Sequence, residues 1–150
     1  MVKPLLVSGL LVLLAALPPA QASLNAGPVS TDMQVPLSGT VFYDLSDESL
    51  PLSGWMHVNT QVTPKGSIEV RVNLDGVSGI GETTAIRYNA IGRDQATVPL
   101  DVSITQEFDF RIIPADGFTF SCGLRVRLGL TFSADGTLTD VNVEQLSVFH

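Results

Sequence analysis

Polar and apolar residues alternate along one long stretch of the chain. From Phe118 to Phe132 every even position is apolar, and the odd positions between them are Thr, Ser, Gly or Arg. A strict period of two residues is typical of a β-strand with one buried face and one face in water. We therefore expect a strand over residues 118–132, with Cys122 in the core and Arg125 and Arg127 outside.

The same alternation predicts a hairpin over residues 56–74. Even positions are apolar or Thr from Met56 to Val62, and apolar from Ile68 to Leu74. These two sets share a face only if the loop between them has an odd number of residues, and Pro64-Lys65-Gly66 provides three. The predicted core pairs are Val62–Ile68, Val58–Val72 and Met56–Leu74, and the predicted outer pairs are Gln61–Glu69, Asn59–Arg71 and His57–Asn73.

A second hairpin is predicted over residues 98–132. The even residues from Val98 to Ile112 are apolar except Gln106. Because this run must share a face with residues 118–132, the loop must again be odd in length, and Ala115–Gly117 fits. The predicted pairs are Phe110–Cys122, Phe108–Leu124 and Gln106–Val126.

A third hairpin is predicted at Asp135-Gly136, the strongest type of two-residue turn signal. Leu146 and Val148 lie at even positions, whereas the apolar residues just before them are odd. One extra residue at Glu144-Gln145, a β-bulge, would return both to the buried face. The predicted pairs are Leu130–Val141 and Leu128–Val143.

Arg125 and Arg127 could form an anion-binding fork or pair with acids on neighbouring strands. The predicted register places Glu107 opposite Arg125 and Glu144 beside Arg127. A ladder of cross-strand ion pairs is therefore favoured over the fork, and each exposed pair would contribute only about 0 to 1 kcal/mol.

The remaining pattern completes an all-β prediction. Residues 39–44 indicate a short strand, residues 86–92 a weaker one, and Arg93-Asp94-Gln95 a turn. Gly123 and Gly129 on the outer face permit a sharp bend. We expect an antiparallel meander of about seven or eight long, coiled strands that closes as a barrel or folds over as a sandwich.

The first residues predict a secretory signal peptide. Lys3 precedes an apolar run from Leu5 to Leu17, and Ala20-Gln21-Ala22 has the form of a cleavage site. The run is too short to span a bilayer, so we expect no transmembrane helix in the mature chain. The expected organisation is a signal peptide over 1–22, a flexible leader or short edge strand over 23–38, and one all-β domain over 39–150.

Composition narrows the classes of partner. The net charge is −7, which makes nucleic acid an unfavourable partner. Cys122 is the only cysteine, so neither an intrachain disulfide nor a cysteine-based zinc site can form. A protein partner, or a second copy that pairs along the edge from Val141 to Phe149, remains open. No cofactor is predicted.

Two loops carry candidate chemistry. Asp44, Asp47 and Glu48 are weak candidates for calcium, but they lack the spacing of a known metal loop, so a solvated acidic loop is favoured. Residues 75–84 form a glycine-rich connection, for which a crossover or bulge is favoured over a binding loop. If it does bind a ligand, the candidate residues are Gly76, Ser78, Gly79, Gly81, Glu82 and Tyr88.

The motif Gly76-Val77-Ser78-Gly79-Ile80-Gly81, followed by Thr83-Thr84 and Tyr88-x-Ala90-x-Gly92, resembles a group of small, uncharacterised exported bacterial proteins. The resemblance covers about residues 53–149 and implies export and an all-β fold, without an activity or a site. Members of that group have Gly after the paired Thr, where this chain has Ala85.

Three functions follow as hypotheses. The first is an exported, non-enzymatic β-domain that acts as a binding or structural module in the periplasm or outside the cell. The second is a carrier whose barrel holds a small apolar ligand. The third is a small outer-membrane β-barrel, which lacks support from aromatic girdles because the chain has one Trp and two Tyr. His57, with Asp75 within diagonal reach, is favoured as an exposed histidine rather than a catalytic one.

Overall fold

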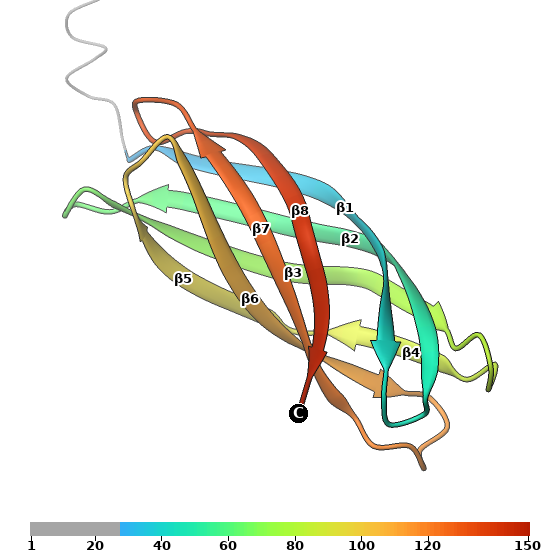
Figure 1. Cartoon of the computed structure of the whole chain (residues 1–150). Helices are drawn as coiled ribbons and strands as arrows, with labels where there is room; N and C mark the ends of the chain where they lie inside the picture. The colour runs from blue at the N-terminus through green and yellow to red at the C-terminus, as the bar shows by residue number, and fades with distance from the viewer. Residues whose placement is uncertain (1–27) are drawn as a thin grey trace, which may run out of the picture.

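The computed structural model describes residues 28–150, which form one nearly closed, barrel-like antiparallel sheet (Figure 1). The predicted all-β meander is therefore confirmed, while the predicted signal peptide and residues 23–27 of the leader lie outside the described residues. Residues 28–150 contain no helix with the length and hydrophobicity of a membrane span. The strands are β1 (Ser30–Tyr43), β2 (Glu48–Val62), β3 (Ser67–Ile80), β4 (Arg87–Ile91), β5 (Arg93–Pro99), β6 (Ser103–Pro114), β7 (Cys122–Phe132) and β8 (Leu138–Phe149).

β4 and β5 follow β3 along most of its length and are separated by Gly92. The φ of 124° at Gly92 is in a region that side chains rarely adopt, and it breaks the strand. The predicted turn at Arg93-Asp94-Gln95 is wrong, because these residues begin β5. β4 also pairs with β6, whereas β5 pairs with β3 alone, so the sheet forks beyond Gly92. At the fork, the Asp109 N–H donates to Asp94 Oδ2 at 2.9 Å.

β1 and β8 close the sheet without a backbone ladder between them. The Leu138 N–H donates to Thr31 Oγ1 at 3.2 Å, and His150 Nε2 lies 2.8 Å from Asp44 Oδ2. These contacts fall in the same order along both strands, so β1 and β8 run in the same direction, as Figure 1 shows. If eight strands alternated strictly in direction, β1 and β8 would be antiparallel. Here β4 and β5 together take the place of one strand beside β3, so β1 and β8 are parallel.

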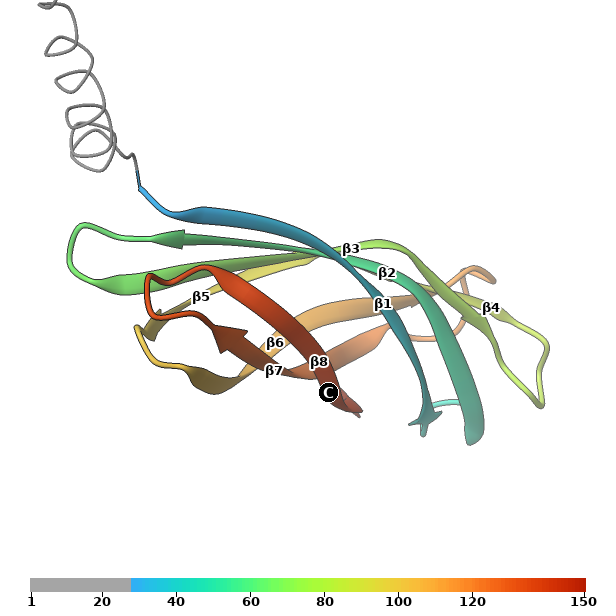
Figure 2. The ribbon, with the colours of Figure 1, turned by 90° about the horizontal axis from the view of Figure 1, so that it is seen from above.

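The interior is filled with apolar side chains. The curvature seen in Figure 2 brings β1, β2, β3 and β5 over β6, β7 and β8. The side chains between them form one cluster of buried residues, as the alternating pattern predicts. Its fully buried members include Met56, Val58, Ile68, Val70, Val72, Phe108, Leu124, Val126 and Leu128.

The predicted register of β2 and β3 is confirmed, and all six predicted pairs are present. The glycine-rich segment that follows is not a long connection, because β3 continues through it to Ile80. Pairing shifts by one residue between Ser53 and Trp55, opposite Gly76, whose φ is 65°. The bulge favoured for this segment is therefore confirmed, and the turn itself spans only a few residues after Ile80.

The predicted register of β6 and β7 is wrong by two residues. The structure pairs Phe110 with Leu124, Phe108 with Val126 and Gln106 with Leu128. The loop is longer than predicted because Asp116 accepts hydrogen bonds from the N–H groups of Phe118 and Thr119, at 3.0 Å each. Phe118 and Phe120, predicted to be in the core strand, are 91% and 77% exposed. The loop still has an odd number of residues, as predicted, because a shift of two residues keeps every side chain on its face.

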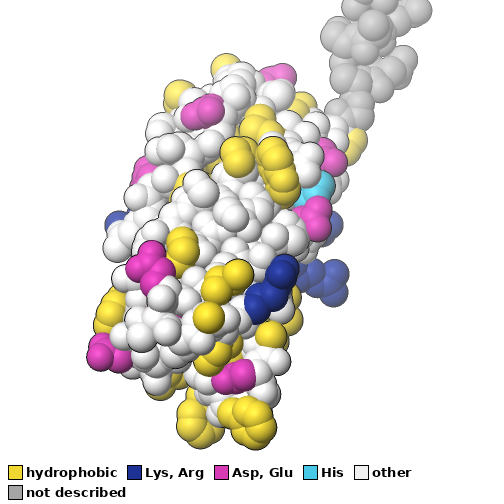
Figure 3. All heavy atoms as spheres, turned by 90° about the vertical axis from the view of Figure 1, so that its right-hand side faces the viewer, with side chains coloured by type: hydrophobic (Ala, Val, Ile, Leu, Met, Phe, Trp, Pro, Cys, Tyr) yellow, Lys and Arg dark blue, Asp and Glu magenta, His cyan; other side chains and the backbone are white. Residues whose placement is uncertain are grey.

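The start of β6 also differs from the prediction, which followed the alternation from Val98, whereas β6 begins at Ser103. Leu100 and Val102 continue the even alternation, but they lie in the turn before β6 and are exposed. Exposed hydrophobic side chains also occur at the turns between β1 and β2, between β3 and β4, and between β6 and β7. Figure 3 views the molecule from the right-hand side of Figure 1, where these three turns lie, and shows hydrophobic side chains in separate patches among polar atoms.

The outer face of β6 and β7 carries the predicted ladder of ion pairs, with different partners. Arg125 pairs with Asp109 through Nε and Nη2, at 2.7 and 2.8 Å, and Arg127 Nη2 pairs with Glu107 at 2.7 Å. Arg125 Nε also lies 3.7 Å from Glu107. Glu144, predicted beside Arg127, instead extends over Gly129. The two-residue shift of β6 against β7 explains the exchanged partners of Arg125 and Arg127, whereas Glu144 is the extra residue of the β8 bulge.

The last hairpin has the predicted pairs Leu130–Val141 and Leu128–Val143, and the predicted bulge at Glu144. Its turn differs from the prediction. The Ser133 N–H donates to the Thr137 carbonyl at 2.9 Å, so three residues form the loop, and a second register shift follows between Thr131 and Phe132. Three loop residues and one bulge give the same downstream register as the predicted two-residue loop.

β1 begins at Ser30 and buries Val35 and Leu37, so an edge strand occupies residues 30–38 and the expected domain boundary at residue 39 lies within it. The edge of β8, considered above as a contact for a second copy, faces β1. Leu146 fits against Gly39, where a Cβ would lie 2.6 Å from the Leu146 side chain.

Candidate functional site

The glycine-rich motif surrounds a buried carboxylate. Glu48, at the start of β2, is 2% exposed. Its Oε2 accepts the N–H groups of Thr83 and Thr84 at 3.0 and 2.9 Å. Its Oε1 accepts the Thr84 hydroxyl at 2.8 Å and the Tyr88 hydroxyl at 2.9 Å. We call this arrangement of Glu48, Thr83, Thr84 and Tyr88 the Glu48 latch.

The latch joins the β1–β2 turn to the β3–β4 turn. Tyr88 lies in β4 with its ring in the core, and its hydroxyl is also 2.9 Å from Ser46 Oγ in the β1–β2 turn. The Glu82 N–H donates to the Ser49 carbonyl at 3.1 Å, next to the latch. Two hairpin ends that are far apart in sequence are thereby fixed to each other.

Two glycines of the motif are required by this close approach. A Cβ on Gly81 would lie 2.3 Å from both carboxylate oxygens of Glu48. A Cβ on Gly79 would lie 1.9 Å from the Pro51 carbonyl oxygen. Any side chain at either position would force the β3–β4 turn away from β2.

The latch favours the ionised form of Glu48. Burial acts to raise the Glu48 pKa, but the hydrogen bonds from Thr84, Tyr88 and Thr83 outweigh it and lower the pKa below its usual range. The pKa of Tyr88 is raised by burial and by its hydrogen bond to Glu48, although the contact with Ser46 works in the opposite direction. Tyr88 therefore stays a neutral donor, which suits an ionised acceptor.

A second tyrosine extends this polar end of the core. The ring centroids of Tyr43 and Tyr88 are 4.7 Å apart. The Tyr43 hydroxyl donates to the Phe120 carbonyl, which fixes the β6–β7 loop over the same end. Burial raises the pKa of Tyr43, and burial also raises the pKa of Cys122 nearby. The predicted inward, buried position of Cys122 is confirmed.

The latch has the geometry of a structural element. Both Glu48 oxygens are occupied by donors from the chain itself, so neither is directed at an open site. The other residues predicted to bind a ligand do not converge on one site. Ser78 Oγ accepts a hydrogen bond from Arg87 Nη2 at 3.5 Å, Gly76 forms the bulge, and the Glu82 side chain is exposed.

The acidic residues considered for calcium do not converge. Asp44 pairs with His150, and the hydrogen bond from His150 lowers the Asp44 pKa. Glu48 is held in the latch, while Asp47 is exposed in the turn. Within residues 28–150 no three His, Cys, Asp or Glu side chains are placed to hold a metal ion.

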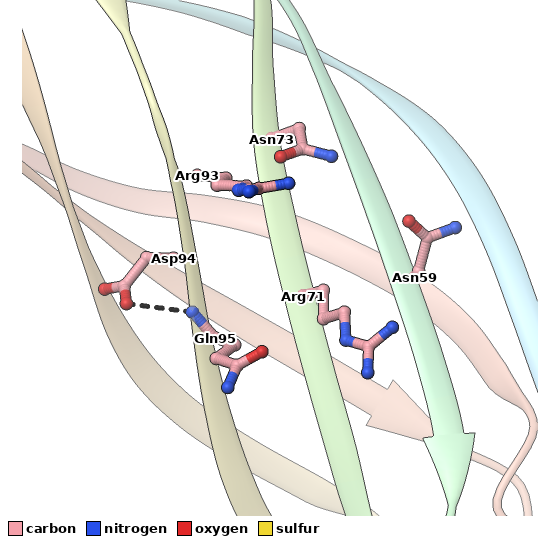
Figure 4. A pocket seen from close by; sticks show the side chains of 6 residues that line it. All are labelled: Asn59, Arg71, Asn73, Arg93, Asp94 and Gln95. Atoms are coloured by element: carbon pink, nitrogen blue, oxygen red, sulfur yellow. Dashed lines mark hydrogen bonds between the residues drawn. The ribbon is translucent and has the colours of Figure 1, made fainter.

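A different surface is open to a ligand. The outer face of β2, β3 and β5 has a hollow of about 530 Å³ (Figure 4). In Figure 4, Arg93 extends from β5 toward its register partner Asn73 on β3, and Arg71 points from β3 toward β2. A second hollow of about 400 Å³ adjoins it over β1, β2 and β3. The first hollow is lined by Asn59, Arg71, Asn73, Arg93, Asp94 and Gln95.

Trp55 and His57 extend this surface along β2. Side chains two residues apart on a strand point to the same side, so Trp55, His57 and Asn59 all lie on the outer face of β2. Trp55 is 46% exposed, and His57 Nε2 lies 3.4 Å from Asp75 Oδ2. We call the outer face formed by Trp55, His57, Asn59, Arg71, Asn73, Arg93 and Gln95 the polar platform.

The charges of the platform are mixed. Arg71 forms an ion pair with Glu69, and its side chain is nevertheless 60% exposed. Arg93 has no ion-pair partner within the part of the chain that the structure describes. Asp94 is engaged by the N–H groups of Gln95 and Asp109. The surface therefore offers guanidinium and amide groups without a strong excess of either charge.

Sequence reasoning placed much of the platform correctly but did not identify it as a site. The outer pairs Asn59–Arg71 and His57–Asn73 were predicted, whereas Arg93 and Gln95 were assigned to a turn. The signal that could have identified the platform is Trp55, a large aromatic residue at a position whose parity points outward.

Comparisons with known proteins give this chain no relative. No family model, curated protein or solved structure matches it. The resemblance to a group of exported bacterial proteins thus stays a prediction, and the geometry described above is what bears on function.

Proposed function

We propose that the protein is an exported, non-enzymatic binding module that contacts a polar partner through the polar platform. The observation that carries this proposal is the hollow over β2, β3 and β5, where guanidinium and amide groups face solvent beside an exposed tryptophan. Positions on β-strands are well suited to hold such groups, because they are more rigid than positions on loops.

Export rests on the sequence of the first 22 residues, with cleavage expected after Ala22. The site of action would be the periplasm or the extracellular medium. Sequencing the amino terminus of the protein recovered from its source should give Ser23, and an intact Met1 would argue against export by this route.

A non-enzymatic role is supported by the way the titratable groups are used. Glu48 is occupied by the latch, and the acids beside Arg125 and Arg127 are occupied by the ladder. The contact between His57 and Asp75 lies on the exposed platform, where it can orient a ligand.

The two alternative functions have less support from the geometry. A carrier of apolar ligands needs interior space, whereas the side chains between the two sides of the sheet form one buried cluster. An outer-membrane barrel needs an outward apolar band, whereas the outer faces of β3, β6 and β7 carry charged and polar residues.

The proposal can be tested with a platform variant that carries Trp55→Ala, Arg71→Ala and Arg93→Ala. Each protein would be expressed in the source organism, purified, and analysed by native mass spectrometry and glycan and protein composition analysis. We expect a molecule that co-purifies with the unmodified chain and with Gln145→Ala, an exposed control on β8, but not with the platform variant. Equal recovery by all three folded proteins would overturn the proposal.

A further inference from the structure

We infer that the polar platform binds a neutral oligosaccharide, with Trp55 against the face of one sugar ring and the amide and guanidinium groups on the hydroxyls of the next. This inference rests on the proposed function and specifies its ligand. It is carried by the layout of the platform, by the hydrogen-bonding capacity of its side chains, and by its charge.

The platform side chains lie in three adjacent rows that cross the strands. Trp55 is opposite Asp75, His57 is opposite Asn73 and then Arg93, and Asn59 is opposite Arg71 and then Gln95. Rows on one face of a strand are about 7 Å apart and neighbouring strands about 4.8 Å apart. The hollow is therefore wide enough for two or three linked sugar rings.

The side chains match the chemistry of a sugar. Each hydroxyl of a sugar both donates and accepts a hydrogen bond, and the amides of Asn59, Asn73 and Gln95 also do both. Arg93 supplies additional donors in a fixed plane. The exposed indole of Trp55 has an electron-rich face, which attracts the C–H groups on the flat side of a pyranose ring.

The placement of the platform argues against a peptide. Peptides are recognised mainly by addition to a free strand edge or by insertion of apolar side chains into a groove. β2 and β3 are each paired with strands on both sides, so their backbone groups are already used. β5 pairs with β3 alone, and its other edge lies beside β6, where the Asp109 N–H donates to Asp94 Oδ2. Apart from Trp55, the side chains that line the platform are polar.

The charge of the platform argues for a neutral saccharide. The chain has a net charge of −7. Glu69, Asp75 and Asp94 lie beside Arg71, Trp55 and Arg93 and offset the two guanidinium charges, so the platform does not favour a polyanion such as nucleic acid or a polyuronate. Guanidinium groups paired in this way still have donors for uncharged hydroxyls.

The test uses the full chain labelled with ¹⁵N and four hexasaccharides. Three are neutral, made of β-linked glucose, β-linked mannose or β-linked N-acetylglucosamine, and the fourth is a hexagalacturonate. Amide chemical shifts and calorimetry would give the site and the dissociation constant. We expect millimolar or tighter binding of at least one neutral probe, with shift changes confined to β2, β3 and β5 and their neighbours.

Variants locate the binding and separate packing from recognition. Trp55→Ala should weaken binding of the neutral probe by about tenfold, and Trp55→Phe should restore part of it, because Phe keeps an aromatic face. Arg93→Ala should weaken binding by about fivefold, since several hydrogen bonds are lost. Gln145→Ala should leave the dissociation constant unchanged.

Three results would overturn the inference: no binding of any neutral hexasaccharide, shift changes that map away from the platform, or binding of hexagalacturonate alone. None of them overturns the proposed function by itself. If a protein or another non-saccharide molecule co-purifies in a platform-dependent way while the neutral probes fail, the platform is a binding surface and only its ligand class is wrong.

Discussion

The Glu48 latch and the ion-pair ladder on β6 and β7 both use carboxylates to connect neighbouring strands, but their surroundings differ. Glu48 is buried and accepts hydrogen bonds from neutral groups. Glu107 and Asp109 lie at the surface and pair with Arg127 and Arg125. Water can replace either partner of an exposed ion pair at little cost, whereas removal of a buried carboxylate takes the acceptor from several donors at once. The latch should therefore determine stability, and the ladder should hardly affect it.

Removing the buried carboxylate should have the largest effect. Glu48→Ala leaves two N–H groups of the β3–β4 turn and the Tyr88 hydroxyl without their acceptor, and we expect a loss of about 3 kcal/mol in the free energy of unfolding. Urea unfolding measures it. Glu82→Ala, an exposed glutamate in the same turn, is the matched control and should change the value by less than about 0.5 kcal/mol. Similar losses in both variants would remove the distinction drawn between buried and exposed carboxylates.

Crowding the latch should have the next largest effect. Gly81→Ala places a methyl group where the Glu48 carboxylate lies, so we expect a loss of about 2 kcal/mol. In the Glu48→Ala background the same substitution should cost much less, because the obstructing carboxylate is absent. The double-mutant cycle, measured by urea unfolding, would contradict this account if the two losses were additive.

Breaking the ladder should have a small effect. Arg127→Gln removes the pair with Glu107 at the surface, and we expect a loss of at most about 1 kcal/mol. The loss should shrink further as salt is added. Thermal unfolding at low and high ionic strength tests both points. A loss as large as that of Glu48→Ala would show that the ladder, too, is structurally essential.

Relieving strain in the latch turn should give the smallest effect, with the opposite sign. Ala85 has a φ of 61°, a left-handed conformation that costs a residue with a side chain about 1 kcal/mol or more. Ala85→Gly removes this cost but increases the freedom of the unfolded chain, so we expect a net gain of about 0.5 kcal/mol. A decrease in the midpoint of urea unfolding would contradict the strained backbone described at this position.

Much of the sheet follows from alternation alone. The β2–β3 register was predictable because Pro64-Lys65-Gly66 has an unambiguous length and both flanking runs have the same parity. The β6–β7 register was not, since Phe118 and Phe120 continue the apolar alternation into a loop that Asp116 organises by local hydrogen bonds. Whether a residue is at an odd or an even position fixes which face of the sheet it occupies. It does not distinguish two registers that differ by two residues.

The latch and the platform were harder to predict from the sequence than the sheet. Glu48 was grouped with Asp44 and Asp47 as part of a solvated loop, because local sequence does not show that Thr84 and Tyr88 will surround it. The resemblance did single out Tyr88, which belongs to the latch, and the position of Ala85, which lies in the β3–β4 turn. The platform was missed because Arg93 and Gln95 join it across a strand break at Gly92, which reads as the start of a turn.

The pH dependence of the latch follows from the lowered pKa of Glu48. Because the folded-state pKa lies below the ordinary value of 4.5, the latch stabilises the fold at and above that pH. Its contribution is lost as the pH falls below 4.5 and through the folded-state pKa.

The most direct test is an NMR titration of the Glu48 side-chain carboxyl carbon in the folded protein, assigned by its absence in Glu48→Gln. We predict that Glu48 remains mainly ionised at pH 4.5 and titrates at lower pH. A midpoint at or above 4.5 would contradict the claim that the glycine-rich turn surrounds and stabilises a buried carboxylate.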